Sequence, residues 1–124
     1  MLKILPSLLL ASGLLLAGVT SPVLSTEAEA DAEAQLDESL KRFGYLTGLA
    51  RGCVVEQQQT DLEREALDIH AGIGRLLGTD RAFFFSSSFG YGTSVSLEAK
   101  ECAEVLQRYE ERVAKFRSQS GAKP

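Results

Sequence analysis

The chain has 124 residues with 17 acidic and 13 basic side chains, which give a formal net charge of −4. Because there is no basic excess to neutralise phosphate groups, this balance argues against nucleic acid as a partner. The sequence contains no asparagine, which excludes N-linked glycosylation.

The first twenty-five residues have the pattern of a signal peptide. Lys3 gives a short basic start, the stretch 4–19 is largely apolar, and small residues precede a predicted cleavage after Ser25. The alternative is an uncleaved anchor helix, which would be the protein's only expected contact with a membrane. Cleavage leaves 12 basic and 17 acidic side chains, a net charge of −5, on a chain long enough for one small domain. We therefore expect an exported protein of the periplasm, the extracellular space or another oxidising lumen.

Residues 26–35 form an acidic, alanine-rich stretch that is either a solvated tail or an extension of the first helix. Thr26 and Glu29 have the spacing of a capping box, which favours a helix, whereas the low apolar content favours a tail. From Leu36 to about Gln57, apolar residues recur at intervals of three and four and predict an amphipathic helix. Its buried stripe should consist of Leu36, Leu40, Phe43, Thr47, Ala50 and Val54.

Two further helices follow in a predicted helical domain that covers residues 36–117. Thr60 and Glu63 form a second capping box, and Gly78 is the predicted stop. The apolar stripe between them should consist of Leu62, Ala66, Ile69, Ile73 and Leu76. The third helix should begin near Ser96. Its stripe should consist of Cys102, Val105, Leu106, Tyr109, Val113 and Phe116. Residues 118–124 are predicted to be a disordered C-terminus.

These elements predict an all-α fold, a small three-helix bundle linked by one disulfide, with a four-helix bundle as the alternative. In an exported protein, Cys53 and Cys102 are expected to pair, the alternative being two buried free thiols. A plain up-down-up bundle would leave them at opposite ends, roughly 25 Å apart, whereas a disulfide needs Cα atoms within about 7 Å. The aromatic and glycine-rich residues 79–95 should therefore return the chain along the bundle, with a short helix possible near Asp80 to Ser86.

Three glycines of the first helix, Gly44, Gly48 and Gly52, fall four residues apart on one face. Each costs about 1 kcal/mol of helix stability relative to alanine, so three glycines on one face need a structural explanation. Three interpretations stay open: the returning aromatic segment lies in this groove, a partner chain or second copy lies there, or the helix breaks at Gly44 or Gly52.

No residue pattern indicates catalysis, a metal or a cofactor. His70 is the only histidine, and a metal site or catalytic site needs convergent partners. Ser86 to Ser88 lack a nucleophile-elbow pattern and are interpreted as loop serines. We expect a protein that is not an enzyme. If an enzyme were hidden in this chain, His70 and Tyr91 would be the residues to watch.

The expected role is binding, or a structural or accessory one, with another protein or a second copy as partner. Five of the nine aromatic residues lie between Arg81 and Ser94, and any that is exposed would mark the binding surface. The candidate surface comprises Phe83, Phe84, Phe85, Phe89, Tyr91, Gly44, Gly48 and Gly52. One alternative is a small-ligand carrier with a cavity between the return segment and the helices.

A second alternative comes from the overall organisation of the chain, which is similar to that of small periplasmic acid-stress chaperones. The common features are a signal peptide, a short helical mature chain and one disulfide across about fifty residues. That resemblance implies a protein whose aromatic segment becomes exposed at low pH, when the acidic side chains are protonated.

Overall fold

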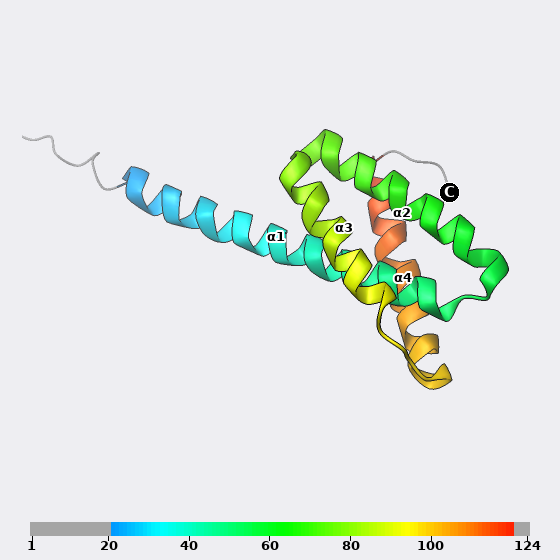
Figure 1. The fold of residues 1–124 in the computed structure, drawn as a ribbon. Coiled ribbons are helices and arrows are strands. Elements are labelled where there is room, and N and C mark those ends of the chain that lie inside the picture. Colours follow the sequence, from blue (N-terminus) through cyan, green and yellow to red (C-terminus); the bar gives the residue numbers. More distant parts are fainter. Residues whose placement is uncertain (1–20, 121–124) are drawn as a thin grey trace, which may run out of the picture. The chain divides into compact units, whose positions relative to one another are not determined.

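The computed structural model describes residues 21–120, and these form four α-helices (Figure 1). They are α1 (Ser21–Cys53), α2 (Glu56–Leu77), α3 (Thr79–Thr93) and α4 (Ala99–Ser120). The all-α prediction is confirmed, whereas the three-helix prediction is wrong. The predicted signal peptide lies outside the described residues except for its last five, which begin α1.

The chain divides into two units, Met1–Glu33 and Ala34–Pro124. In the first unit the described residues belong to α1, and the side chains from Thr26 to Glu33 are all exposed. The stretch 26–35 is therefore helical, and Thr26 lies inside α1 rather than at its cap. No part of the helices described combines the length and apolar character of a transmembrane span.

The second unit holds a hydrophobic core that all four helices share. The predicted stripes of α1, α2 and α4 supply most of it, and Phe43 contacts the rings of both Phe85 and Phe116 at centroid distances of 5.3 and 6.1 Å. Leu76 is the exception, since it lies at the end of its stripe but is mostly exposed. The buried side chains include Leu40, Phe43, Thr47, Ala50, Leu62, Ala66, Ile69, Ile73, Ala82, Phe85, Val105, Tyr109 and Val113.

Residues 79–93 form the helix α3, which replaces the predicted long aromatic and glycine-rich return segment and extends well beyond the short helix considered near Asp80 to Ser86. Three consecutive phenylalanines place aromatic rings around much of the helix, so they hide the helical period of the sequence. The inward residues Ala82, Phe85, Phe89 and Gly92 do follow intervals of three and four. Figure 1 shows α2 and α3 side by side, joined at a single residue, Gly78.

Gly78 has a backbone φ of 100°, in the region that glycine tolerates and that other residues rarely adopt. Its N–H donates to the Gly74 carbonyl, and its own carbonyl accepts from Ala82, so one residue ends α2 and begins α3. The predicted stop at Gly78 is confirmed, and the chain reverses there without a longer loop.

Two predicted boundaries are wrong by several residues. α1 ends at Cys53 and α2 already begins at Glu56, so Thr60 lies within α2 and does not cap it. The glutamines at 57–59, which precede Thr60, are good helix formers and extend α2 toward its N-terminus. The Gln59 side chain donates to the Arg51 carbonyl at the end of α1.

The C-terminal helix also departs from its predicted bounds. α4 begins at Ala99, where the Glu98 N–H donates to the Glu101 carboxylate, one half of a capping box. It continues through Ser118 to Ser120, which the sequence placed in a disordered tail, and residues 121–124 lie outside the described part.

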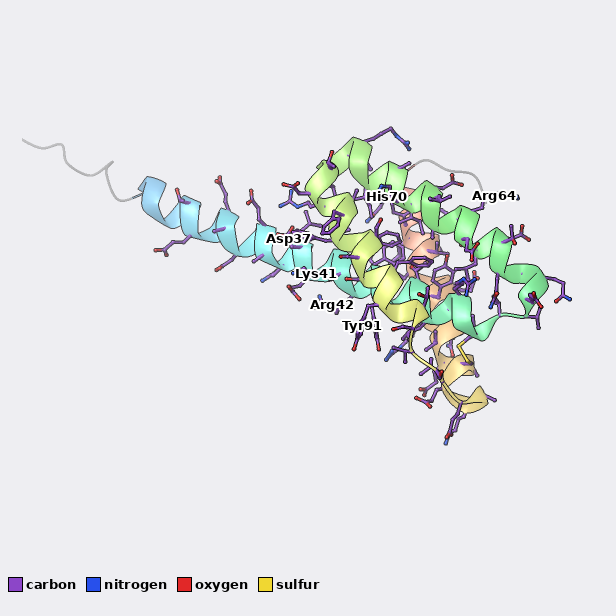
Figure 2. The ribbon with its side chains drawn as sticks, viewed as in Figure 1. Asp37, Lys41, Arg42, Arg64, His70 and Tyr91 are labelled. Carbon is purple, nitrogen blue, oxygen red and sulfur yellow. A yellow bond between two sulfur atoms is a disulfide. The ribbon has the colours of Figure 1, made fainter. Side chains whose placement is uncertain are left out.

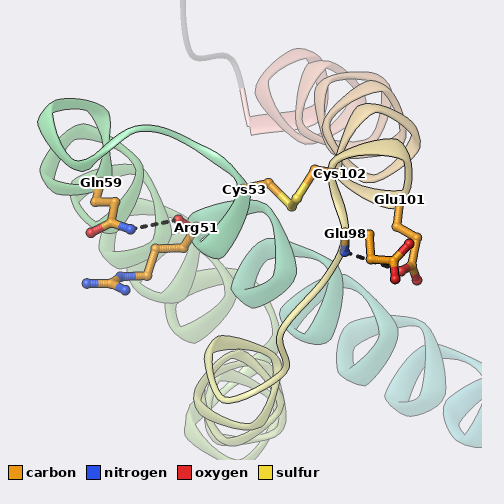
Figure 3. The surroundings of a disulfide bond; sticks show 6 residues. All are labelled: Arg51, Cys53, Gln59, Glu98, Glu101 and Cys102. Atoms are coloured by element: carbon orange, nitrogen blue, oxygen red, sulfur yellow. Dashed lines mark hydrogen bonds between the residues drawn. A yellow bond between two sulfur atoms is a disulfide. The ribbon is translucent and has the colours of Figure 1, made fainter.

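The Cys53 and Cys102 sulfurs lie 2.11 Å apart, with a Cα–Cα distance of 5.3 Å, and join the end of α1 to the first turn of α4 (Figure 3). The expected pairing is therefore confirmed. α3 rises about 22 Å along its axis, enough to carry the chain back to the end at which α1 finishes. A bonded pair is consistent with an oxidising compartment.

Candidate functional site

The glycine face of α1 is covered by α3, and the contact is between backbones. A Cβ atom at Gly44 would lie 2.1 Å from the carbonyl oxygen of Phe85, and one at Gly48 would lie 2.3 Å from that of Phe89. Gly92 is the counterpart on α3, where a Cβ would lie 2.4 Å from the Tyr45 carbonyl. Only glycine leaves room for this approach. Of the three interpretations of this face, the structure therefore favours the one in which the aromatic segment fills the groove.

Gly52 takes no comparable part in this contact. A Cβ there would meet nothing closer than the Val95 carbonyl at 4.0 Å, and the residue is exposed. Of the three glycines placed on the candidate surface, Gly44 and Gly48 are thus buried under α3, while Gly52 lies open near the disulfide.

The close contact fixes the rotation of α3 and so decides where each aromatic side chain lies. Phe85 is 1% exposed and belongs to the core. Phe89 is half-buried, and Phe84 is half-buried beneath the Lys41 ammonium, which lies 5.0 Å from its ring centroid. Phe83 and Tyr91 are 64% and 66% exposed. They lie eight residues apart on the outer face of α3, about 12 Å along its axis.

An open groove of about 340 Å³ lies beside Tyr91, between α1 and α3. We call it the aromatic groove. Its two tyrosine rings, Tyr45 and Tyr91, stack with centroids 5.6 Å apart and planes 29° from parallel. Figure 2 shows Lys41, Arg42 and Tyr91 on the same side of the bundle. The residues lining the groove are Lys41, Arg42, Tyr45, Ser87, Ser88 and Tyr91.

The aromatic groove is locally basic in an acidic protein. Its lining has two cationic side chains and no carboxylate. Lys41 is paired with Glu38 at 3.0 Å, but Arg42 forms no ion pair with any residue that the structure describes. The groove thus presents two amphipathic rings and an unneutralised guanidinium to solvent, a combination suited to carboxylates beside apolar groups.

His70 and Ser86 form a contact that sequence spacing does not reveal. The Ser86 Oγ and His70 Nδ1 atoms lie 2.5 Å apart, between α3 and α2, at the edge of a pocket of about 230 Å³. Ser86, Ser87 and Ser88 all lie within α3, so none of them is a loop serine, and Ser86 has a histidine partner. Among the described residues no carboxylate hydrogen-bonds to His70, so the third member of a catalytic triad is missing from this pair. The contact links two adjacent helices.

A second polar contact ties α2 to α4 in the core. The buried Tyr109 hydroxyl donates to the Glu65 carboxylate at 2.5 Å, and Glu65 also pairs with Arg117. Burial, reinforced by this hydrogen bond, raises the pKa of Tyr109 well above its usual value. These groups satisfy one another, so we assign them a structural role.

Metal binding has no obvious site in the described part of the chain, where no three histidine, cysteine or acidic side chains cluster suitably. Both cysteines are joined to each other and are not free to act as ligands.

Sequence reasoning missed Lys41, Arg42 and Tyr45 as members of the site. The signal that could have found them is position, since Tyr45 lies between Gly44 and Gly48 and must flank whatever covers that face. Comparison of the chain with protein-family models, curated proteins and solved structures finds no match.

Proposed function

We propose that this is an exported, non-catalytic binding protein that holds an acidic segment of a partner protein in the aromatic groove. The observation that carries the proposal is the stacked Tyr45–Tyr91 pair beside Arg42, a cation without an ion-pair partner among the described residues. Tyrosine and arginine are enriched at the energetic centres of protein interfaces.

Rigidity supports the proposal. The backbones of α1 and α3 touch at Gly44, Gly48 and Gly92, so the groove is built on two helices that cannot slide freely. Tyr91 is further held by stacking on Tyr45. A partner would therefore meet side chains that are already placed, and the ordering cost of binding would be small.

The dimensions favour a peptide segment over a compact small molecule. The groove is open, and Phe83 continues the exposed aromatic face about 12 Å along α3 from Tyr91. An extended or helical segment can contact both ends of such a face. Carboxylates on that segment would be attracted by Arg42, and its apolar side chains would cover Phe83 and Tyr91.

A random peptide library tests the proposal even though the partner is unidentified. Phage-displayed random peptides are selected on the oxidised protein and, in parallel, on a Phe83→Ser/Tyr91→Ser variant. We expect enrichment, on the unmodified protein alone, of peptides with aspartate or glutamate next to an aromatic residue. A Val55→Ser variant is the control, because Val55 is 61% exposed but lies outside the groove.

The affinity of a synthetic peptide from that selection then measures how much charge contributes to binding. Arg42→Gln should weaken its binding, and the loss should shrink at high salt, because exposed charges are screened. The proposal is wrong if the same peptides enrich on the double variant, or if enriched peptides lack acidic residues.

A further inference from the structure

A separate pocket of about 280 Å³ lies between α1, α2 and α4 and shares no lining residue with the aromatic groove. Its walls are apolar except for Arg112 and Gln119. The main wall residues are Leu40 and Phe43 of α1, Ile73 and Leu76 of α2, and Phe116 of α4. The volume is near the lower end of the range for small-molecule sites, about 300 Å³.

Arg112 is a half-buried cation in this pocket without a carboxylate partner in the described part of the chain. Its Nη2 atom donates to the Ser39 hydroxyl at 3.0 Å, and its guanidinium carbon lies 4.7 Å from the centroid of the Phe43 ring. A guanidinium has five N–H donors, so most of them are not used by these contacts.

Arg112 has a cation, and no paired carboxylate, among its described neighbours. On its own helix, the residues three and four positions away are Arg108, Tyr109, Lys115 and Phe116, none of them acidic. From α1, Arg42 acts on it electrostatically. Burial and this neighbouring cation both lower the pKa of Arg112, because each disfavours its charged form. An anion bound here would relieve both effects.

We propose that this pocket binds a small amphiphile with one anionic head and one apolar chain, such as a medium-chain carboxylate. The head would take the free N–H donors of Arg112, as carboxylates do with guanidinium groups. The chain would lie against Phe43, Ile73 and Phe116. Leu76 is 65% exposed although it lines the pocket, so it would be covered further by the chain.

Calorimetric titration of the oxidised protein with decanoate, below its micelle-forming concentration, tests the proposal. Decanol and decyltrimethylammonium serve as probes with the same chain and a different head. We expect saturable binding of decanoate, at least tenfold tighter than that of decanol, and no measurable binding of the cation. Absence of decanoate binding, or equal affinity for decanoate and decanol, would overturn the proposal.

Two pairs of matched variants locate the site. Arg112→Gln should weaken decanoate binding at least tenfold, whereas Arg108→Gln, one turn earlier on α4, should leave it unchanged. Leu76→Gln should weaken binding at least threefold, whereas Leu67→Gln should not, although Leu67 is 68% exposed on the same helix. The leucine pair does not perturb the core, so it decides the question even if Arg112→Gln fails to fold. Equal effects within the leucine pair would contradict the assigned pocket.

Discussion

Substitution of Gly44 by alanine probes the backbone contact between α1 and α3, on which the aromatic groove depends. Its Cβ atom would lie 2.1 Å from the Phe85 carbonyl oxygen, more than 1 Å closer than ordinary van der Waals contact. The obstacle is backbone, so α3 must move away from α1, and Phe85 loses part of its burial. Overpacking of this kind typically costs about 1–3 kcal/mol or more, whereas the gain in helix propensity is about 1 kcal/mol.

Because the crowding is severe, we expect Gly44→Ala to lower the free energy of unfolding by about 2 kcal/mol. For a domain of this size that corresponds to a fall in Tm of roughly 8 to 16 °C. The assay is urea unfolding of the oxidised protein, followed by circular dichroism at 222 nm.

Gly90→Ala is the matched control within α3, because nothing lies within 4 Å of its added Cβ atom. It should raise stability by up to about 1 kcal/mol through helix propensity alone. If Gly44→Ala proves as stable as Gly90→Ala, the backbones of α1 and α3 do not touch, and the aromatic groove is not held by their contact.

Two further predictions concern the bonds that hold the helices together. Replacing both Cys53 and Cys102 by serine should lower stability by about 4 kcal/mol in the chain-entropy model, since their sequence separation is 49; an unchanged urea midpoint would contradict a stabilising bridge. The folded protein should retain the Tyr109 proton above pH ~10, where the unfolded chain releases it. The contribution of this tyrosine to stability should therefore be fully present below that pH and decrease as the pH rises further. Urea unfolding at pH 8 and pH 11 should show a smaller loss in Tyr109→Phe than in the unmodified protein, and equal losses would refute this assignment.

Much of the fold follows from the sequence because three helices have regular apolar stripes. Phe43, Ile69 and Tyr109 lie at their predicted core positions, since an amphipathic helix has one face that can be buried. The export signal and the even number of cysteines also predict that Cys53 pairs with Cys102, and the 5.3 Å Cα–Cα distance confirms that pair.

The helical structure of residues 79–93 could not be predicted, because the apolar pattern of this segment does not by itself decide which side chains face the core. Phe83, Phe84 and Phe85 are equally apolar, and only the contact of Gly44 and Gly48 with α3 decides which of them is buried. The cations of the candidate site come from another helix, so no short motif contains both Arg42 and Tyr91. The Ser86–His70 contact likewise depends on how α2 and α3 pack.

Backbone NMR tests whether the aromatic groove is the binding surface. An acidic peptide obtained by selection is titrated into the ¹⁵N-labelled, oxidised protein while amide shifts are followed. We expect the largest shifts at Arg42, Tyr45, Ser87 and Tyr91, and we expect them to disappear in Tyr91→Ser. Shifts concentrated on α2 and α4, with the groove amides unchanged, would contradict this assignment.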